Sequence, residues 1–139
     1  MSTAYFDSNA FVKLLVDEDG SDSAVMLWDA ASEVVSNILA YVEVRAALAA
    51  AWRGGRIDDG QLDGAEDEWE GYWSSVRPID LTELIARVAA QECRKHALSG
   101  ADGVHLASAL AVSEAGVVVV SWDKRLSAGA RAAGLPVSP

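Results

Sequence analysis

The stretch TAYFDSNAF, residues 3–11, brings a short apolar run directly up to an aspartate, Asp7. Short apolar runs bounded by polar residues are typical of strands buried in a sheet. A strand that only filled a core would end in a turn residue without a fixed partner, so Asp7 needs a further reason. The segment GVVVVSWDKRL, residues 116–126, repeats the arrangement, because a second apolar run is followed by Ser121 and Asp123. We therefore expect two buried strands whose ends each deliver a carboxylate.

The rest of the chain alternates between strand and helix patterns. This alternation is typical of an α/β fold, in which a mostly parallel sheet of about four to five strands is covered by helices on both faces. Such a sheet places Asp7 and Asp123 at its carboxyl edge, where open α/β sheets bind their ligands. Asn9 and Asp80 are expected to cap the first and the fifth helix. The expected strands cover residues 3–7, 33–36, 76–79, 117–121 and 136–138, and the expected helices cover residues 9–16, 22–32, 38–55, 58–75, 81–97, 101–115 and 124–133.

Length and composition favour a small globular protein. The 139 residues, of which 51% are hydrophobic, are expected to form one domain, residues 1–139. Uncharged apolar stretches fall far short of the ~20 residues of a membrane helix, and the first residues lack the basic region of a signal peptide. Cys93 is the single cysteine, so no internal disulfide can form. These features predict a cytoplasmic protein with no membrane partner.

The net charge is −10, from 21 acidic and 11 basic residues. Taken alone, this charge disfavours a protein that binds nucleic acid, because phosphates are attracted to basic surfaces. Much of the excess is local, since residues 58–70 contain seven acids and no base. The remainder is close to balanced, so net charge is only a weak argument against an RNA-binding function. The seven acids are Asp58, Asp59, Asp63, Glu66, Asp67, Glu68 and Glu70.

Two further acids stand in apolar surroundings. Glu43 lies in the middle of the alanine-rich helix expected for residues 38–55, where its neighbours one turn away are apolar. An ionised carboxylate buried there without a partner costs several kcal/mol, and Arg45 lies on another face of the helix. Asp102 opens the helix expected for residues 101–115, where a capping box with Ser99 is the simpler explanation.

Four carboxylates can converge on one pocket at the carboxyl edge of the sheet, those of Asp7, Glu43, Asp102 and Asp123. Carboxylates at such short range repel each other, which raises some of their pKa values, and a divalent metal ion removes the conflict. An all-oxygen set of ligands selects Mg²⁺ or Mn²⁺ over zinc. Each aspartate also has a purely structural explanation, such as a strand-end turn for Asp7 and a helix N-cap for Asp123. His105 and His96 are expected to be a packed and a solvated histidine rather than ligands.

Four blocks of the sequence resemble, in order and spacing, the motif blocks of PIN-domain ribonucleases, in particular the VapC-type toxins of bacterial toxin–antitoxin pairs. The blocks are DSNAFVKLL (7–15), AYVEVRAAL (40–48), LSGADGVHLASAL (98–110) and VVVVSWDKRLSAGARAAGLPV (117–137). The resemblance implies a PIN-like fold and an endoribonuclease that depends on Mg²⁺ or Mn²⁺. It also implies metal ligands at Asp7, Glu43, Asp102 and Asp123, with Asn9 and Ser121 orienting ligands or water. Two residues depart from the family pattern: Gly103 stands where the family mostly has alanine, and Trp122 is bulky beside Asp123.

The resemblance further implies three partners, an RNA substrate, an antitoxin protein with a basic tail, and a second copy of the chain. The residues Tyr41, Leu48 and Trp52 recur at helical spacing, so they line such a homodimer contact or belong to the core. A catalytically inactive PIN-like scaffold that binds RNA or protein, and a PIN nuclease of RNA processing, remain as alternatives. A phosphatase of the haloacid dehalogenase type is disfavoured because it needs a second carboxylate where Asn9 stands. A phospho-receiver domain is disfavoured because it needs paired acids after the first strand.

Overall fold

A computed structural model of the chain describes residues 2–139 and contains a five-stranded sheet in which all neighbouring strands are parallel. The strand order is β3-β2-β1-β4-β5, so the first strand lies at the centre of the sheet. Every strand expected from the sequence is present, with ends that differ by at most one residue. The strands are β1 (Thr3–Phe6), β2 (Glu33–Asn37), β3 (Val76–Ile79), β4 (Val117–Val120) and β5 (Val137–Ser138).

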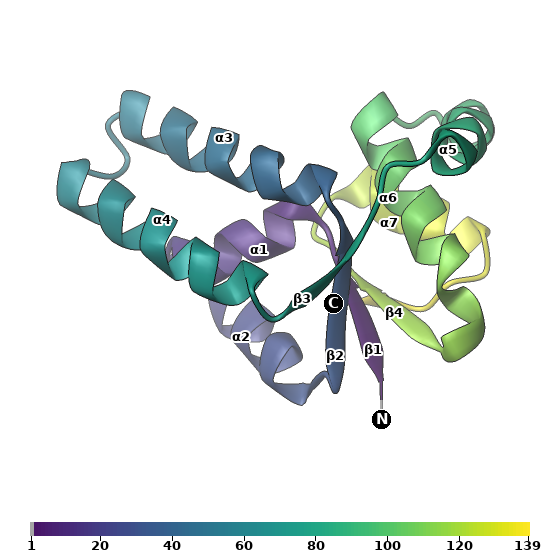
Figure 1. The fold of residues 1–139 in the computed structure, drawn as a ribbon, viewed down its shortest axis with the longest axis horizontal. Helices are drawn as coiled ribbons and strands as arrows, with labels where there is room; N and C mark the ends of the chain where they lie inside the picture. The colour runs from purple at the N-terminus through teal and green to yellow at the C-terminus, as the bar shows by residue number, and fades with distance from the viewer. Residues whose placement is uncertain (1) are drawn as a thin grey trace.

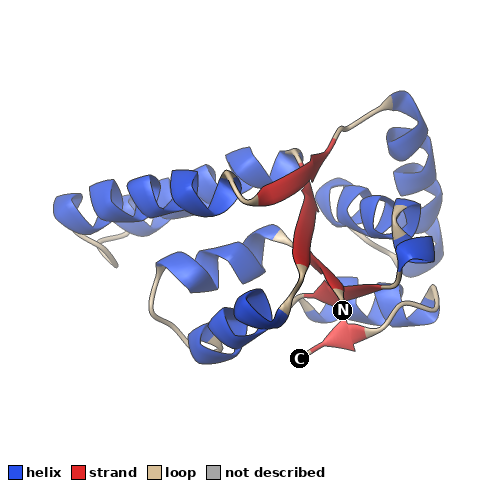
Figure 2. Cartoon of the chain, turned by 60° about the horizontal axis from the view of Figure 1, so that its bottom comes forward, coloured by secondary structure: helices blue, strands red, loops and turns tan. Residues whose placement is uncertain are grey.

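Helices cover both faces of this sheet, which confirms the α/β architecture (Figures 1 and 2). Helices α1 to α4 pack on one face and α5 to α7 on the other, each with its own apolar cluster. The expected 101–115 helix is shorter than predicted and is followed by a 3-10 turn, Ser113–Ala115. The helices are α1 (Ser8–Leu15), α2 (Ser21–Ala30), α3 (Leu39–Arg53), α4 (Asp59–Trp73), α5 (Glu83–His96), α6 (Gly100–Ala111) and α7 (Lys124–Ala132).

Strand β1 shows how the two faces are filled. Side chains alternate between the faces of a strand, so Ala4 and Phe6 join the cluster with α1 and α3, whereas Tyr5 joins the cluster with α6 and α7. All three side chains are buried. Because both faces are covered, the strand is an uninterrupted apolar run rather than an alternating one. In the part of the chain that the structure describes, no helix is long and apolar enough to cross a membrane.

Helices α3 and α4 form a long pair beside the sheet (Figure 1). Leu48 is fully buried in this cluster, and Tyr41 stacks on Trp69 with the ring centroids 6.1 Å apart. Trp52 is 43% exposed, and its Nε1–H donates to Asp59 at 2.7 Å. The three residues considered as a dimer contact, Tyr41, Leu48 and Trp52, therefore pack mainly against α4, and only Trp52 is left at the surface.

The acidic segment forms α4, which Arg45 of α3 partly neutralises. The Nη2 atom of Arg45 lies 2.6 Å from Glu66, and its Nη1 atom lies 3.7 Å from Glu70. Helix α4 begins with a capping box between Asp58 and Gln61. Arg45 is thus committed to α4, in agreement with the prediction that it does not neutralise Glu43.

Two helix caps differ from the sequence prediction. Helix α1 is capped by Asp7, whose Oδ1 accepts the backbone N–H of Ala10 at 2.8 Å, while Asn9 lies inside the first turn and is exposed. Helix α5 is capped by Thr82 and not by Asp80. Both predictions were wrong for the same reason, because several residues that can cap a helix stand close together and the end of the preceding strand decides which one is used.

The connections produce a reversal of strand order at the centre of the sheet. After β1 the chain adds β2 and β3 on one side, and it then returns to add β4 and β5 on the other. The order of addition reverses between β1 and β4, where Phe6 is paired with Val120. Ligands of open α/β sheets bind at such reversals, outside the carboxyl ends of the strands. Asp7 follows β1 and Ser121 follows β4 at this point.

Candidate active site

Asp7 and Ser121 are hydrogen-bonded to each other where β1 and β4 end. The hydroxyl of Ser121 donates to Asp7 Oδ2 at 2.5 Å, and the other carboxylate oxygen caps α1. Only 3% of the surface of Asp7 is exposed. This burial raises the pKa of Asp7, and the hydrogen bonds from Ser121 and Ala10 lower it only in part. The first strand-end carboxylate is therefore fixed in orientation and costly to ionise.

Ser121 also binds the second strand-end aspartate. Its Oγ accepts the backbone N–H of Asp123 at 3.1 Å, so one hydroxyl joins both aspartates. Asp123 caps α7, because its Oδ1 accepts the N–H of Leu126 at 2.9 Å. Within residues 2–139, no hydrogen bond occupies its other oxygen, Oδ2. The N-cap predicted for Asp123 is confirmed, and it leaves one carboxylate oxygen for another role.

Asp102 lies in the first turn of α6, with its side chain half-buried. Ser99 caps the helix and accepts the backbone N–H of Asp102 at 3.2 Å. Burial raises the pKa of Asp102, and the negative charges of Asp123 and Glu43 raise it further. Asp123 likewise adds to the effect of burial on the pKa of Asp7. The four predicted acids are thus close enough to act on one another electrostatically, in a chain that runs from Asp7 through Asp123 and Asp102 to Glu43.

Glu43 is bound by His105, a partner that the sequence did not reveal. His105 is 2% exposed, and its Nε2 lies 2.6 Å from Glu43 Oε1. On the other side of the ring, Nδ1 lies 2.7 Å from the hydroxyl oxygen of Tyr5. The Tyr5 oxygen accepts the backbone N–H of Asn37 at 3.0 Å, so its own hydrogen is free to point at Nδ1. The ring then carries its hydrogen on Nε2 and donates it to Glu43.

A buried polar network extends behind this pair. Asn37, at the end of β2, donates its side-chain N–H to Ser108 at 2.9 Å, and its side-chain oxygen accepts the N–H of Leu39. Ser108 in turn donates to the carbonyl of Val104. Asn37 and Ser108 are fully buried, and burial raises the pKa of Tyr5. The network orders the beginning of α3, which carries Glu43, and joins it to the middle of α6, which carries Asp102.

The sequence contains a signal for this network. Asn37 is a polar residue at the end of a short strand that includes Val34 and Val35, and His105 interrupts a helix segment of mostly small and apolar residues. Buried polar groups need partners, so two such interruptions on neighbouring elements indicate a contact. The packed state predicted for His105 is correct. His96 is not solvated, however, because it is half-buried against Glu92, with Nε2 3.0 Å from Oε2.

The donor set fits a divalent cation in its chemistry. Its atoms are carboxylate oxygens, which Mg²⁺ and Mn²⁺ prefer as ligands. Burial and the neighbouring carboxylates raise the pKa values of Asp7 and Asp102, and a bound cation would oppose this effect. Among residues 2–139, no three Asp, Glu, His or Cys side chains stand close enough together to hold one ion in the positions described. Because Asp7 and Glu43 are each held by protein hydrogen bonds, ion binding requires carboxylates to turn toward a common point.

The two departures from the family pattern have local explanations. A methyl group at Gly103 would lie 2.3 Å from Cys93 Sγ and 2.9 Å from the carbonyl oxygen of Ala89, so α5 and α6 approach too closely for alanine. The Trp122 ring lies against Gly20, and the ammonium group of Lys13 is 5.2 Å from its centroid. Gly103 and Trp122 both leave the four acidic residues of the site in place.

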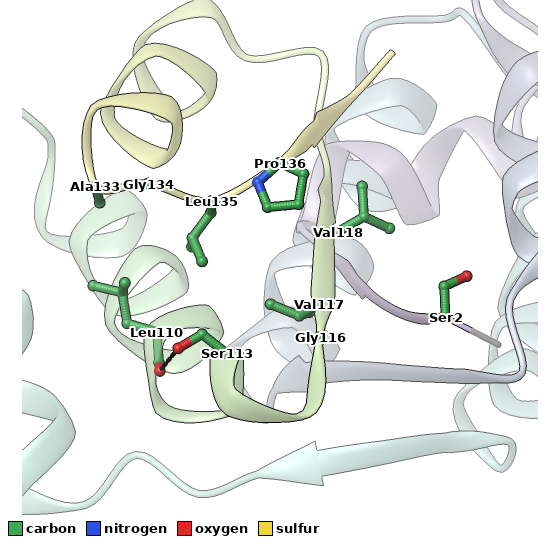
Figure 3. Close-up of a pocket in the computed structure, with 10 residues that line it drawn as sticks. All are labelled: Ser2, Leu110, Ser113, Gly116, Val117, Val118, Ala133, Gly134, Leu135 and Pro136. Atoms are coloured by element: carbon green, nitrogen blue, oxygen red, sulfur yellow. Dashed lines mark hydrogen bonds between the residues drawn. The ribbon is translucent and has the colours of Figure 1, made fainter.

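A surface hollow without acidic residues lies elsewhere. It has a volume of about 490 Å³ and is lined by the start of β4, the end of α6 and the turn before β5 (Figure 3). Its lining includes Leu110, Val117 and Leu135, and the polar Ser113 is bonded to the carbonyl of Leu110 at 2.8 Å. The hollow is at the amino end of β4 and contains no titratable side chain, so it does not compete as the site of chemistry.

The fold and this edge of acidic residues are those of a nuclease-like α/β domain, and a comparison with protein families identifies the family. The family model described as "PIN domain" matches residues 4–132 of this chain. The chain belongs to the PIN domain family, which confirms the resemblance drawn from the four sequence blocks.

Two relatives are similar over the whole chain. Ribonuclease VapC45 of Mycobacterium tuberculosis (strain CDC 1551 / Oshkosh) and Ribonuclease VapC49 of strain ATCC 25618 / H37Rv are each 52% identical over 139 residues, which is 100% of this chain and 96% of the relative. Two solved structures share the fold at low identity. A toxin-antitoxin complex from Klebsiella pneumoniae has a TM-score of 0.68 at 17% identity, and FitAcB from Neisseria gonorrhoeae has a TM-score of 0.69 at 18% identity. Each comparison covers 98% of this chain and 96% of the other.

Proposed function

We propose that this protein is an endoribonuclease that depends on Mg²⁺ or Mn²⁺ and serves as the toxin of a toxin–antitoxin pair. The two relatives at 52% identity are named ribonucleases, and this identity extends over the whole length of the chain. The observation that carries the proposal is the pair of strand-end aspartates, Asp7 and Asp123, joined by Ser121 at the reversal of strand order.

The proposed metal ligands are Asp7, Asp102, Asp123 and Glu43. When bound, a divalent ion would polarise the scissile phosphate and lower the pKa of the attacking water. Hydrogen bonds within the chain orient two of these carboxylates before an ion binds. Ser121 and the start of α1 hold Asp7 by both oxygens, and His105 holds one oxygen of Glu43. Asn9 is exposed in the first turn of α1, where it would orient a ligand or water.

No side-chain nucleophile is needed for this chemistry. Hydrolysis of a phosphodiester can use water, and the carboxylates then serve to place charge rather than to form a covalent bond. The buried hydroxyl nearest to Asp7, that of Ser121, already donates to Asp7 and accepts from Asp123. It is therefore a positioning residue in this proposal.

The experiment that tests this function is RNA cleavage under control of the metal. Purified protein is incubated with an end-labelled single-stranded RNA of mixed sequence in Mn²⁺, in EDTA, and in EDTA followed by excess Mn²⁺. We expect internal cleavage in Mn²⁺, none in EDTA, and recovery after Mn²⁺ is restored. RNA binding without cleavage under all three conditions would instead support the inactive scaffold.

The toxin role involves a protein partner. The carboxylate edge and the acidic helix α4 both present negative charge, so an antitoxin with a basic, arginine-bearing tail is the expected partner. Expression of the chain alone should arrest growth in its host, and co-expression of a small neighbouring gene that encodes such a protein should restore it. Harmless expression of an active nuclease would leave a role in RNA processing. The cytoplasm, where RNA substrates are met, stays the expected location.

A homodimer is the remaining part of the proposal. Its contact is not the row of Tyr41, Leu48 and Trp52 on α3, which packs mainly against α4. Large exposed apolar side chains occur where α3 and α5 begin, at Ile38, Val42, Leu81 and Leu84. Ile38 donates its N–H to the carbonyl of Ile79, which brings the start of α3 next to the segment before α5. Exposed apolar groups of this kind mark protein contacts. Light scattering should give a dimer mass for the wild type and a monomer mass for Leu84→Glu.

A further inference from the structure

The basic residues of this acidic protein are unevenly distributed. The last sixteen residues, 124–139, contain three bases and no acid, directly after the site residue Asp123. These bases are Lys124, Arg125 and Arg131, and all three side chains are exposed. Among residues 2–139, none of them forms a salt bridge, whereas five of the eight other lysines and arginines do. Helix α7 therefore offers uncompensated positive charge beside the carboxylates.

Two of these bases line one hollow next to the site. Lys124 and Arg131 are seven residues apart, which places them on the same face of α7 and ~10 Å apart along the helix axis. They line a hollow of about 260 Å³ together with Ser127, Trp122 and Ser121. Ser127 lies between the two bases on the same helical face. Ser121 is the hydroxyl that joins Asp7 to Asp123, so the hollow adjoins the candidate active site at this residue.

We propose that this hollow binds the phosphate backbone of RNA next to the bond that is cut, with Lys124 and Arg131 as its cationic contacts. The inference rests on the proposed ribonuclease function and adds the residues that bind the substrate. A polyanion that approaches a protein of net charge −10 needs a local region of positive charge. Two bases one above the other on the same face of α7 offer two separate contacts to neighbouring backbone phosphates. Trp122 also lines the hollow, but its ring packs on the apolar cluster of α1 and α3 and beside Lys13, so the proposed contacts to RNA come from the bases on α7.

The arrangement also explains how an acidic protein can use a negatively charged substrate. The acidic helix α4 packs on the face of the sheet opposite to α7, so its carboxylates are separated from the hollow by the sheet. The acids of the active site are adjacent to the hollow, and the substrate would meet them only at the phosphate that reacts. The bases on α7 would thus fix the strand while the carboxylates act on one linkage.

The test measures RNA binding apart from cleavage. In an Asp7→Asn background, which prevents turnover, fluorescence anisotropy with a labelled single-stranded RNA is followed at several salt concentrations. Each of Lys124→Gln and Arg131→Gln should weaken binding several-fold at low salt and lower the slope of log K against log salt by ~0.7, the value for one phosphate contact on a single strand. The double variant should lower it by ~1.4.

The matched control is Arg53→Gln. Arg53 is the last residue of α3, which extends away from the carboxyl edge of the sheet, ~15 Å along the helix from Glu43. The substitution Arg53→Gln removes one positive charge and should leave the affinity for RNA and the slope of log K against log salt unchanged. Equal losses for all three substitutions would show an effect of net charge alone and would overturn the proposal, as would unchanged binding in the α7 variants.

A second readout separates this proposal from the function on which it rests. With Asp7 intact, Arg131→Gln should raise KM for RNA cleavage and leave kcat within about twofold. A contact away from the reacting phosphate stabilises the bound substrate and the transition state equally. A wild-type protein that neither cuts nor binds RNA would overturn the ribonuclease function and the hollow together. A wild-type protein that cuts RNA, with KM unchanged in Arg131→Gln and Lys124→Gln, would overturn the hollow alone.

Discussion

The Nε2 atom of His105 lies 2.6 Å from Glu43 Oε1, so a buried histidine of α6 holds a carboxylate of α3 at the edge of the sheet. This contact joins residues 62 positions apart in the sequence. It answers the question of how Glu43 is accommodated on an apolar helix, since a hydrogen-bonded carboxylate avoids the cost of an unpaired one. It also ties Glu43 to the polar network of Tyr5 and Asn37 in the core.

His105→Ala should destabilise the protein by about 3 kcal/mol, because it creates a cavity and removes the partners of Glu43 and Tyr5. Chemical denaturation measures this loss, and a double-mutant cycle with Glu43→Gln isolates the pair. We expect a coupling of about 1–2 kcal/mol between the two sites. His96→Ala, at the half-buried histidine, serves as the comparison and should show no coupling to Glu43. Strictly additive effects of His105→Ala and Glu43→Gln would contradict the contact.

Asp7→Asn and Asp102→Asn should each raise the melting temperature of the metal-free protein at pH 7. Both carboxyls have a pKa above the usual range because of burial and nearby acids. The folded chain therefore binds these protons more tightly than the unfolded chain, and stability falls as pH rises from the unfolded value of about 3.9 through the raised values. Asparagine loses no proton, and it caps α1 as well as aspartate does.

Thermal unfolding in EDTA at pH 7 and at pH 3 checks this sign. The variants should melt at a higher temperature than the wild type at pH 7, and 1 kcal/mol corresponds to ~3–5 °C in a domain of this size. This difference in melting temperature should vanish at pH 3, where the wild-type carboxyls are protonated. Asp67→Asn, at an exposed acid of α4, is the control and should give no gain. Wild-type protein that is more stable than both variants at pH 7 would contradict the electrostatic account of the site.

Mn²⁺ should raise the melting temperature of the wild type by mass action, since the ion binds the folded site and not the unfolded chain. A variant with Asp7, Asp102 and Asp123 changed to Asn and Glu43 changed to Gln should lose this response. The acidic helix α4 is the competing location for an ion, although Glu66 and Glu70 there are bonded to Arg45 or Tyr41. An undiminished response in the quadruple variant would place the ion outside the predicted site.

Gly103→Ala should destabilise the protein by about 1–3 kcal/mol, because overpacking at the contact of α5 and α6 forces them apart. Cys93→Ala should recover part of the loss by removing the sulfur 2.3 Å from the added methyl group, while the contact with the Ala89 carbonyl remains. Gly64→Ala, in α4, has no atom within 4 Å of the added methyl group and should stabilise the helix by about 0.5–1 kcal/mol. Equal effects at Gly103 and Gly64 would contradict the close packing.

The elements that the sequence predicted well are those with strong local patterns. The apolar runs before Asp7 and Asp123 specified β1 and β4, and the alternation of strands with helices specified a parallel sheet. The same pattern could not specify that β1 and β4 are neighbours, because strand order depends on long-range packing. That neighbour relation is what allows Ser121 to bind both aspartates.

The site was predictable in its acids and not in their partners. Glu43 showed by its apolar helical neighbours that it needs a partner, but periodicity within one helix could only exclude Arg45. His105 is on a different helix and becomes a neighbour only after α3 and α6 have packed on β2. The caps failed in a similar way, since Asp7, Ser8 and Asn9 are all able to cap α1 and the geometry of the strand end selects Asp7.

The central claim is that Asp7 and its neighbouring carboxylates cut RNA. The most direct measurement is the rate of RNA cleavage in Mn²⁺ by the wild type and by Asp7→Asn, with Asp67→Asn as the control for lost charge and circular dichroism to verify the fold. The account predicts cleavage by the wild type and the control, and no cleavage above background by a folded Asp7→Asn. A folded Asp7→Asn protein that cleaves within about tenfold of the wild type, a difference of only ~1.4 kcal/mol in the barrier, would contradict it.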